Sequence, residues 1–187
     1  MKTHTSAQDV AEYLIWLASR ECETDPDYLT PMKLQKLLYY VQGWTLAEWK
    51  RPMFAEPIEA WRDGPVVPAV FARYKKRETL PIIPEKSDPP EALDAQEMAL
   101  IRGVWDRYKR HSAYALRDMT HAETPYTEAY APQDRDGRCS ARIETDRIER
   151  SFEQRIAEAQ ARLRSRRARL DEVARANTQK LTGRDAL

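Results

Sequence analysis

The sequence predicts a mainly α-helical protein, with a compact helical domain followed by a long helical extension at the C-terminal end. Two observations lead to this prediction. Within residues 1–130, apolar side chains recur three and four residues apart in several segments, which is the spacing of one helix face. Residues 140–180 contain no proline or glycine and are rich in strong helix formers. We expect about five helices in the domain, with room for one short β-hairpin.

The central element is predicted to be a helix from Pro31 to about Lys50. Thr30 can cap its first turn, and Pro31 suits the first helical position because its missing N–H costs nothing there. Apolar side chains surround most of this helix, which is typical of a buried one. Leu37 and Leu38 lie on its widest apolar stripe, so we expect both in the core.

Capping and turn signals place the elements on either side of the central helix. Ser6, together with Asp9, can cap a first helix over residues 9–20. The proline-interrupted segment 52–61 is expected to pair as one short strand or to lie extended, and Asp63-Gly64-Pro65 is a strong turn signal. A short helix is predicted over residues 68–74, where apolar residues resume helical spacing.

Two further helices are predicted before the extension. Asp94 can cap a helix through Tyr108, because Glu97 follows three residues later. Ser112 begins a shorter helix that ends near His121. Thr124-Pro125 is expected to break that helix.

Composition and charge indicate an ordinary cytoplasmic protein with two distinct regions. The 187 residues suffice for one domain plus an appendage. Two cysteines are too few for a disulfide framework, and we expect neither a signal peptide nor a membrane span. Residues 1–137 carry 18 Lys/Arg against 22 Asp/Glu (−4), whereas residues 138–187 carry 13 against 8 (+5). An acidic body and a basic tail suggest different tasks.

Three separated blocks of sequence carry a family resemblance. They read TPMKLQKLLYYVQGW (30–44), EPIEAWRDGPVVPAVFARY (56–74) and SAYALRDMTHAETPYTEAY (112–130). In this order and at this spacing they resemble the Panacea domain, an antitoxin domain of many bacterial and phage toxin–antitoxin pairs. The resemblance covers about residues 9–130, so we expect a Panacea antitoxin domain at 1–132 and a charged helical extension at 133–187.

The resemblance is strongest to the SocA-type branch, whose members act as proteolytic adaptors. It implies a protein that binds its cognate toxin and delivers it to the ClpXP protease. An adaptor needs two binding surfaces and no active site, because it works by raising the local concentration of substrate at the protease. Two alternatives stay open: an antitoxin that masks its toxin without protease delivery, and a DNA-binding autorepressor that uses the basic tail.

Few residues suggest catalysis or metal binding. The five glycines do not cluster, so no phosphate-binding loop is apparent. His111, His121 and Glu123, with Asp118 nearby, could be imagined as metal ligands. Zinc needs three or four convergent ligands, however, and neither cysteine is near these residues. We favour structural roles, with His121 forming a hydrogen bond at a helix end, and expect no enzyme activity, cofactor or metal.

The polar side of the central helix is the first candidate surface for a partner. Lys33, Gln35, Lys36 and Gln42 fall on this side, and a plain solvated edge is the alternative interpretation. Basic residues mixed with aromatic ones are typical of protein–protein hot spots. The residues of this region predicted to contact a partner are Lys33, Lys36, Tyr39, Tyr40 and Trp61.

The extension is the second candidate surface. Its apolar residues follow a narrow stripe that Arg166 interrupts, and a helix of this kind is marginal unless it docks. The arginines of segment 162–169 could bind nucleic acid, bind an acidic partner or the protease, or form a solvated face. We favour partner docking for the arginines, and we expect the apolar stripe to become buried only against a partner or against the body. The contact residues predicted here are Phe152, Ile156, Leu163 and Leu170.

Overall fold

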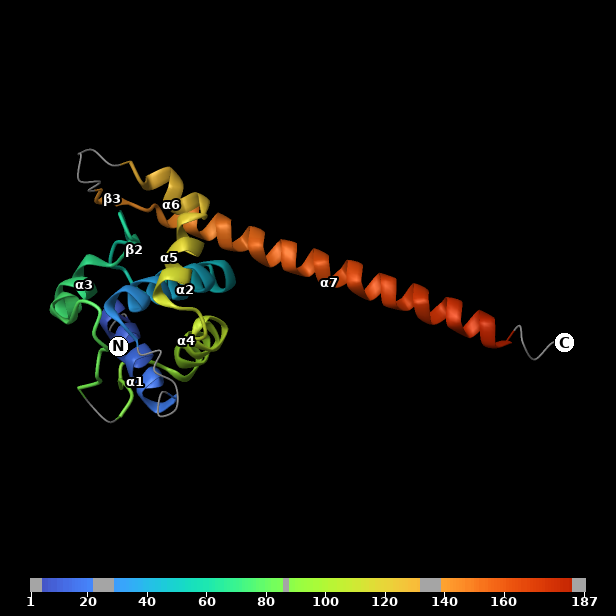
Figure 1. Cartoon of the computed structure of the whole chain (residues 1–187), viewed down its shortest axis with the longest axis horizontal. Helices are drawn as coiled ribbons and strands as arrows, with labels where there is room; N and C mark the ends of the chain where they lie inside the picture. The colour runs from blue at the N-terminus through green and yellow to red at the C-terminus, as the bar shows by residue number, and fades with distance from the viewer. Residues whose placement is uncertain (1–4, 22–28, 86–87, 132–138, 183–187) are drawn as a thin grey trace. The chain divides into compact units, whose positions relative to one another are not determined.

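The computed structural model describes residues 5–21, 29–85, 88–131 and 139–182, with side chains described as far as Glu172. These residues form seven α-helices, one 3-10 helix and a three-stranded antiparallel sheet, so the predicted mainly α class is confirmed (Figure 1). The chain divides into two compact units, Met1–Phe152 and Glu153–Leu187. Among the described helices, none is long and apolar enough to cross a membrane.

Helix α2 (Pro31–Trp49) is the central element of the first unit. The hydroxyl of Thr30 accepts a hydrogen bond from the Lys33 N–H at 3.4 Å, as the capping signal predicted. Leu37 and Leu38 are fully buried, which confirms their place in the core. Five other elements pack around α2, so nearly every side of this helix faces protein. They are α1 (Ala7–Glu21), α3 (Pro68–Tyr74), α4 (Ala95–Tyr108), α5 (Ala113–His121) and β2 (Gly64–Val66).

The small sheet has the strand order β2-β1-β3, with all pairs antiparallel. Strand β1 (Glu59–Trp61) pairs with β2 through the predicted turn, which gives the hairpin that the sequence left room for. Strand β3 (Ala141–Arg142) pairs with the other edge of β1, although these residues were expected to be helical. The reason is tertiary: the backbone of this segment finds ladder partners on β1, and Ile143 is buried beside it.

Local capping fixes α4, as predicted. Asp94 accepts a hydrogen bond from the Glu97 N–H, and the Glu97 carboxylate accepts one from the Asp94 N–H, both at 2.9 Å. This reciprocal arrangement is a capping box. Helix α3 continues into the 3-10 helix η1 (Lys75–Arg77) before the proline-rich connection to α4.

The sequence Thr124-Pro125 ends one helix and begins another. Helix α6 (Thr124–Ala129) follows α5 directly, whereas the sequence interpretation expected only a break. Proline fits here because it occupies the first turn of α6, where no N–H is needed. The short α5–α6 connection holds Glu123 in the interior.

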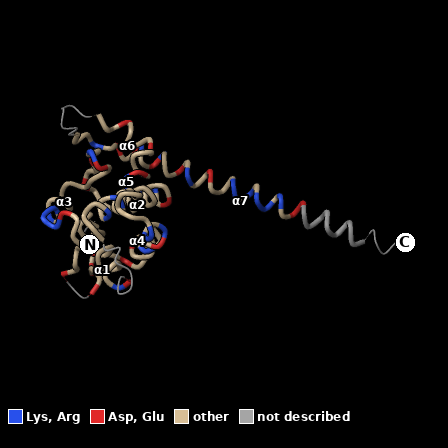
Figure 2. Tube along the Cα trace, viewed as in Figure 1, with Lys and Arg blue, Asp and Glu red and all other residues tan. Residues whose placement is uncertain are grey.

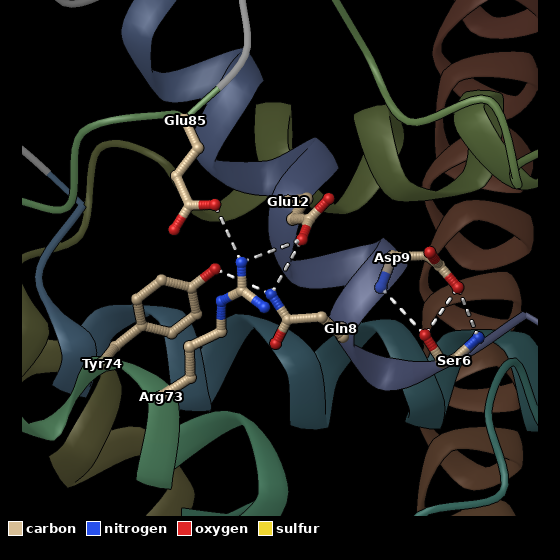
Figure 3. A network of polar contacts seen from close by, with 7 residues as sticks. All are labelled: Ser6, Gln8, Asp9, Glu12, Arg73, Tyr74 and Glu85. Carbon is tan, nitrogen blue, oxygen red and sulfur yellow. Dashed lines mark hydrogen bonds and ion pairs between the residues drawn. The ribbon is translucent and has the colours of Figure 1, made fainter.

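A polar network attaches α3 to α1 and to the segment that follows η1 (Figure 3). The Arg73 guanidinium lies 2.9 Å from the Glu85 carboxylate and 3.8 Å from that of Glu12. The Gln8 amide donates to the Tyr74 hydroxyl at 2.8 Å. The ion pairs are substantially exposed, so each contributes little stability.

The first turns of α7 (Thr145–Thr182) belong to the first unit. Phe152 is fully buried, and its ring makes edge contacts with Tyr39, Tyr40 and Trp44 at centroid distances of 5.2–6.1 Å. A Cβ on Gly43 would lie 2.3 Å from this ring, so the close approach requires glycine there. Residues 139–152 therefore pack with the body, whereas the sequence placed the domain boundary at 132/133.

Replacement of Phe152 by alanine is expected to destabilise the folded chain by about 3–5 kcal/mol, because it leaves a cavity among three aromatic rings. Leu163→Ala is the matched control, since Leu163 is 66% exposed and its truncation should change stability little. Urea unfolding followed by circular dichroism measures both. Equal midpoints for the two variants would contradict the placement of Phe152 in the core.

Candidate functional site

Three segments far apart in the sequence meet at one buried group of polar residues, which we call the polar centre. Helix α2 supplies one set of side chains, and the β1–β2 hairpin supplies a backbone wall. The end of α5 and the α5–α6 connection supply the rest. Each segment comes from a different one of the three sequence blocks. The polar centre consists of Gln35, Lys36, Tyr39, Tyr40, Gly64, Pro65, Thr120, His121 and Glu123.

Lys36 lies against the hairpin turn and is 1% exposed. Its Nζ donates a hydrogen bond to the Pro65 carbonyl oxygen at 3.0 Å. Gly64 has a φ of +98°, and a Cβ there would lie 2.7 Å from Lys36 Cε and 2.8 Å from Thr120 Oγ1. Both the backbone conformation and the packing therefore require glycine at the turn.

Burial lowers the pKa of Lys36 to about 7. Desolvation is the main cause, because a charged ammonium loses more hydration on burial than a neutral amine does. The positive charge of Arg117 lowers the pKa further, and the negative charge of Asp63 opposes both effects. Near neutral pH the buried lysine is thus close to its titration midpoint.

Glu123 joins the α5–α6 connection to α2. Its carboxylate accepts hydrogen bonds from the Tyr39 hydroxyl at 2.7 Å and the Tyr40 hydroxyl at 2.9 Å. All three residues are buried. Two donors compensate the carboxylate for part of its lost hydration, and the carboxylate satisfies two hydroxyl groups that would otherwise be costly to bury.

His121 and Gln35 leave two polar atoms of the polar centre without a partner. The Gln35 Oε1 accepts from the Val67 N–H at 2.8 Å, but its Nε2 and the Nε2 of His121 are buried without a hydrogen bond. The His121 ring stacks on Tyr126 at 4.6 Å. Burial, and then the charges of Lys36 and Arg117, lower the His121 pKa. The expected hydrogen bond at the helix end is therefore not made by Nε2.

The polar side of α2 is buried in this conformation, so it is open neither to the predicted partner nor to solvent. Lys33 and Lys36 are each 1% exposed, and Gln35 and Gln42 are also buried. Lys33 donates from Nζ to the Lys109 carbonyl oxygen at 2.7 Å. The physical reason is that other elements cover this side of the helix too, so its polar side chains bind backbone groups of their neighbours.

The aromatic contact candidates divide into buried and accessible ones. Tyr39 and Tyr40 are fully buried, so neither can contact a partner in this conformation. Trp61 is half-buried on β1, where its Nε1 donates to Glu59 at 2.8 Å and its ring packs against Phe71. The partner contact predicted for Trp61 stays a prediction.

The residues of the apolar stripe of the extension also differ in burial. Phe152 is a core residue of the first unit, so this end of the stripe is buried against the body and is not open to a partner in this conformation. In the second unit, Ile156 is half-buried, Leu163 is 66% exposed and Leu170 is 61% exposed. These three remain candidates for a contact outside the chain.

The convergence of the three blocks agrees with a comparison against known families. The model of the SocA-like antitoxin Panacea domain matches residues 34–127, which is half of the chain. The chain belongs to this antitoxin family. No curated protein and no solved structure matches the chain. Every residue of the polar centre lies within the matched segment, so the polar centre belongs to the Panacea domain itself.

The polar centre of the Panacea domain is an internal set of hydrogen bonds. Its lysine and glutamate are each 5% exposed or less. Within the part of the chain that the structure describes, no group of three or more His, Cys, Asp or Glu side chains is placed to hold a metal ion. The hydrogen bonds of the polar centre join three segments of the fold.

Replacement of Glu123 by alanine is expected to cost about 2–5 kcal/mol, because two buried tyrosine hydroxyls lose their acceptor. Glu123→Gln should cost less, since its amide oxygen can still accept one hydrogen bond. Chemical denaturation of both variants measures the difference. A glutamine variant as unstable as the alanine variant would contradict the role of the carboxylate oxygens as acceptors.

Lys36 predicts a specific pH dependence of stability. The pKa of Lys36 is about 7 in the folded state, against 10.5 for a lysine exposed to water. Between these two pH values the side chain is protonated in the unfolded chain and neutral in the folded chain. Stability should therefore rise from pH 7 to pH 9, by roughly 2 kcal/mol from this residue. Below pH 7 both states are charged, and the cost of burial is constant.

Lys36→Met tests this dependence by removing the titrating group while keeping an unbranched side chain. Denaturation at pH 7, 8 and 9 should give a flatter profile for the variant than for the natural chain. Parallel profiles would show that Lys36 does not lose its proton in this range.

Proposed function

We propose that this chain is an antitoxin that binds a cognate toxin and acts as a proteolytic adaptor, delivering the toxin to the ClpXP protease. Membership of the SocA-like Panacea family supports the antitoxin role and implies a toxin partner. One structural observation favours an adaptor: α7 begins in the core of the domain and continues as a second unit with exposed apolar and basic side chains.

An adaptor has to contact two proteins at once. A second binding surface on the same chain makes the meeting of toxin and protease an intramolecular event, which raises the effective concentration of one near the other. The two units of this chain differ in composition and charge, so they can serve two partners without competing for one surface. No catalytic group of its own is required, and we propose that the chain is not an enzyme.

Purified components test this proposal. The toxin candidate is the product of the neighbouring gene, and the assay contains that protein, ClpXP, ATP and the full chain. We expect rapid loss of the toxin only when the chain is present, while the chain itself persists. Toxin that binds the chain and loses its activity but survives ClpXP would favour direct masking instead. A candidate that neither binds nor loses activity would contradict the antitoxin role for that pair.

Truncation separates the two units. A chain that ends at Arg155 keeps Phe152 and β3 and is expected to fold, whereas a chain that ends at Asp134 loses the buried start of α7 and should be far less stable. We expect the longer fragment to lose toxin delivery while its melting temperature stays close to that of the full chain. Unchanged degradation of the toxin with this fragment would show that the second unit is dispensable.

A further inference from the structure

The second unit presents an apolar stripe on an exposed helix. Ile156, Leu163 and Leu170 are seven residues apart, and Ala159 lies between the first two at the three-four spacing of one helix face. Leu163 and Leu170 are 66% and 61% exposed. Two large aliphatic side chains held in line on a helix are a typical docking feature for another helix.

Basic side chains flank this stripe. Segment 159–170 contains five arginines and no acidic residue, and the middle of the described part of α7 is predominantly basic in Figure 2. Arg166 lies within the stripe, between the two leucines. Arg162 and Arg169 lie along one side of it, and Arg167 lies along the other. An occupant of the stripe therefore meets guanidinium groups on both sides.

A second copy of this helix is a poor occupant. In a parallel pair aligned on Ile156, Leu163 and Leu170, Arg166 would face its own copy in the interface, and Arg162 would face Arg167 of the other copy. An antiparallel pair also opposes arginine to arginine, because every charged residue of segment 159–170 is basic. Like charges at such positions disfavour pairing.

Binding to duplex nucleic acid would not explain why two leucines are exposed beside the arginines. Arginines alone would neutralise phosphates, and the two exposed leucines would then lie within the contact area without an apolar partner. An acidic helix with its own apolar stripe satisfies both features. Its leucines would cover the stripe, and its carboxylates would pair with the flanking guanidinium groups.

We propose that the stripe of Ile156, Leu163 and Leu170, together with its flanking arginines, is a docking site for an acidic amphipathic helix of a protein partner. This inference deepens the proposed function. It rests on that function only for the identity of the partner, which is the toxin or the protease. The docking itself can be measured without either, so the two proposals can fail separately.

A synthetic peptide provides the probe. It is about four heptads long, because shorter helices are marginal in water, with leucine at both core positions and glutamate at the flanking positions. The full chain should bind the labelled peptide in a fluorescence anisotropy titration. A peptide with lysine in place of every glutamate should bind far more weakly, and raising the salt should weaken binding of the acidic peptide.

Paired variants of the full chain test the surface. Leu163→Ser with Leu170→Ser should lower the affinity for the acidic peptide by at least about tenfold. Ala161→Ser with Ala168→Ser is the matched control, since these exposed residues lie on the opposite side of the helix and should leave the affinity unchanged. Arg162→Glu with Arg167→Glu and Arg169→Glu should reverse the preference toward the lysine peptide.

Four outcomes would overturn the proposal. The first is that the natural chain fails to bind the acidic peptide, and the second is that the leucine variant binds it as well as the control does. Binding of a labelled DNA duplex that depends on the arginines but not on the leucines would indicate nucleic acid. A dimer in sedimentation analysis that the leucine variant dissociates would indicate a second copy.

Discussion

The burial of Lys36 against the hairpin turn is the contact on which the rest of the domain depends. A buried amino group, charged or neutral, needs an acceptor, and the Pro65 carbonyl oxygen provides it at 3.0 Å. This bond requires the tight turn at Gly64. The same turn fixes the pairing of β1 with β2, and β3 extends that sheet. A lysine in the middle of α2 therefore determines where the sheet lies against the helices.

Glu123 extends this arrangement to the C-terminal half of the domain. Its two tyrosine donors are on α2, so the α5–α6 connection is tied to the same helix as the hairpin. Tyr39 and Tyr40 also contact the Phe152 ring, which brings the start of α7 into the core. The Panacea domain thus uses one helix as the common partner of three segments, which explains why residues of all three blocks are polar and yet buried.

Local rules in the sequence predicted most of the elements. Caps, prolines and apolar spacing located α2, α3, α4 and α5 closely, because these signals act within one or two turns. Helix α6 was missed because Thr124-Pro125 was interpreted only as the end of one helix, whereas proline also suits the first turn of the next. Strand β3 was missed because its formation depends on a distant partner, β1. The polar edge of α2 was misinterpreted for a similar reason. Lysine and glutamine are exposed on most helices, and their burial here is decided by backbone acceptors on other elements.

The apolar residues of α7 were similarly only half predictable. Their spacing indicated a narrow stripe on one helix face, but spacing cannot tell which end of a stripe is covered. Phe152 is buried because Gly43 leaves room for its ring, and this is a contact between residues more than one hundred positions apart. Farther along the helix, Leu163 and Leu170 have the same spacing but are 66% and 61% exposed.

Hydrogen–deuterium exchange of the full chain, with and without its toxin, tests the central claim most directly. The claim is that the polar residues of the Panacea blocks hold the fold together while the partner binds outward-facing side chains. We predict that the toxin slows exchange within residues 156–170, or around the accessible Trp61, and leaves residues 31–49 unchanged. Faster exchange across 31–49, with both outward-facing regions unchanged, would mean that partner binding opens the polar centre, and would contradict the account.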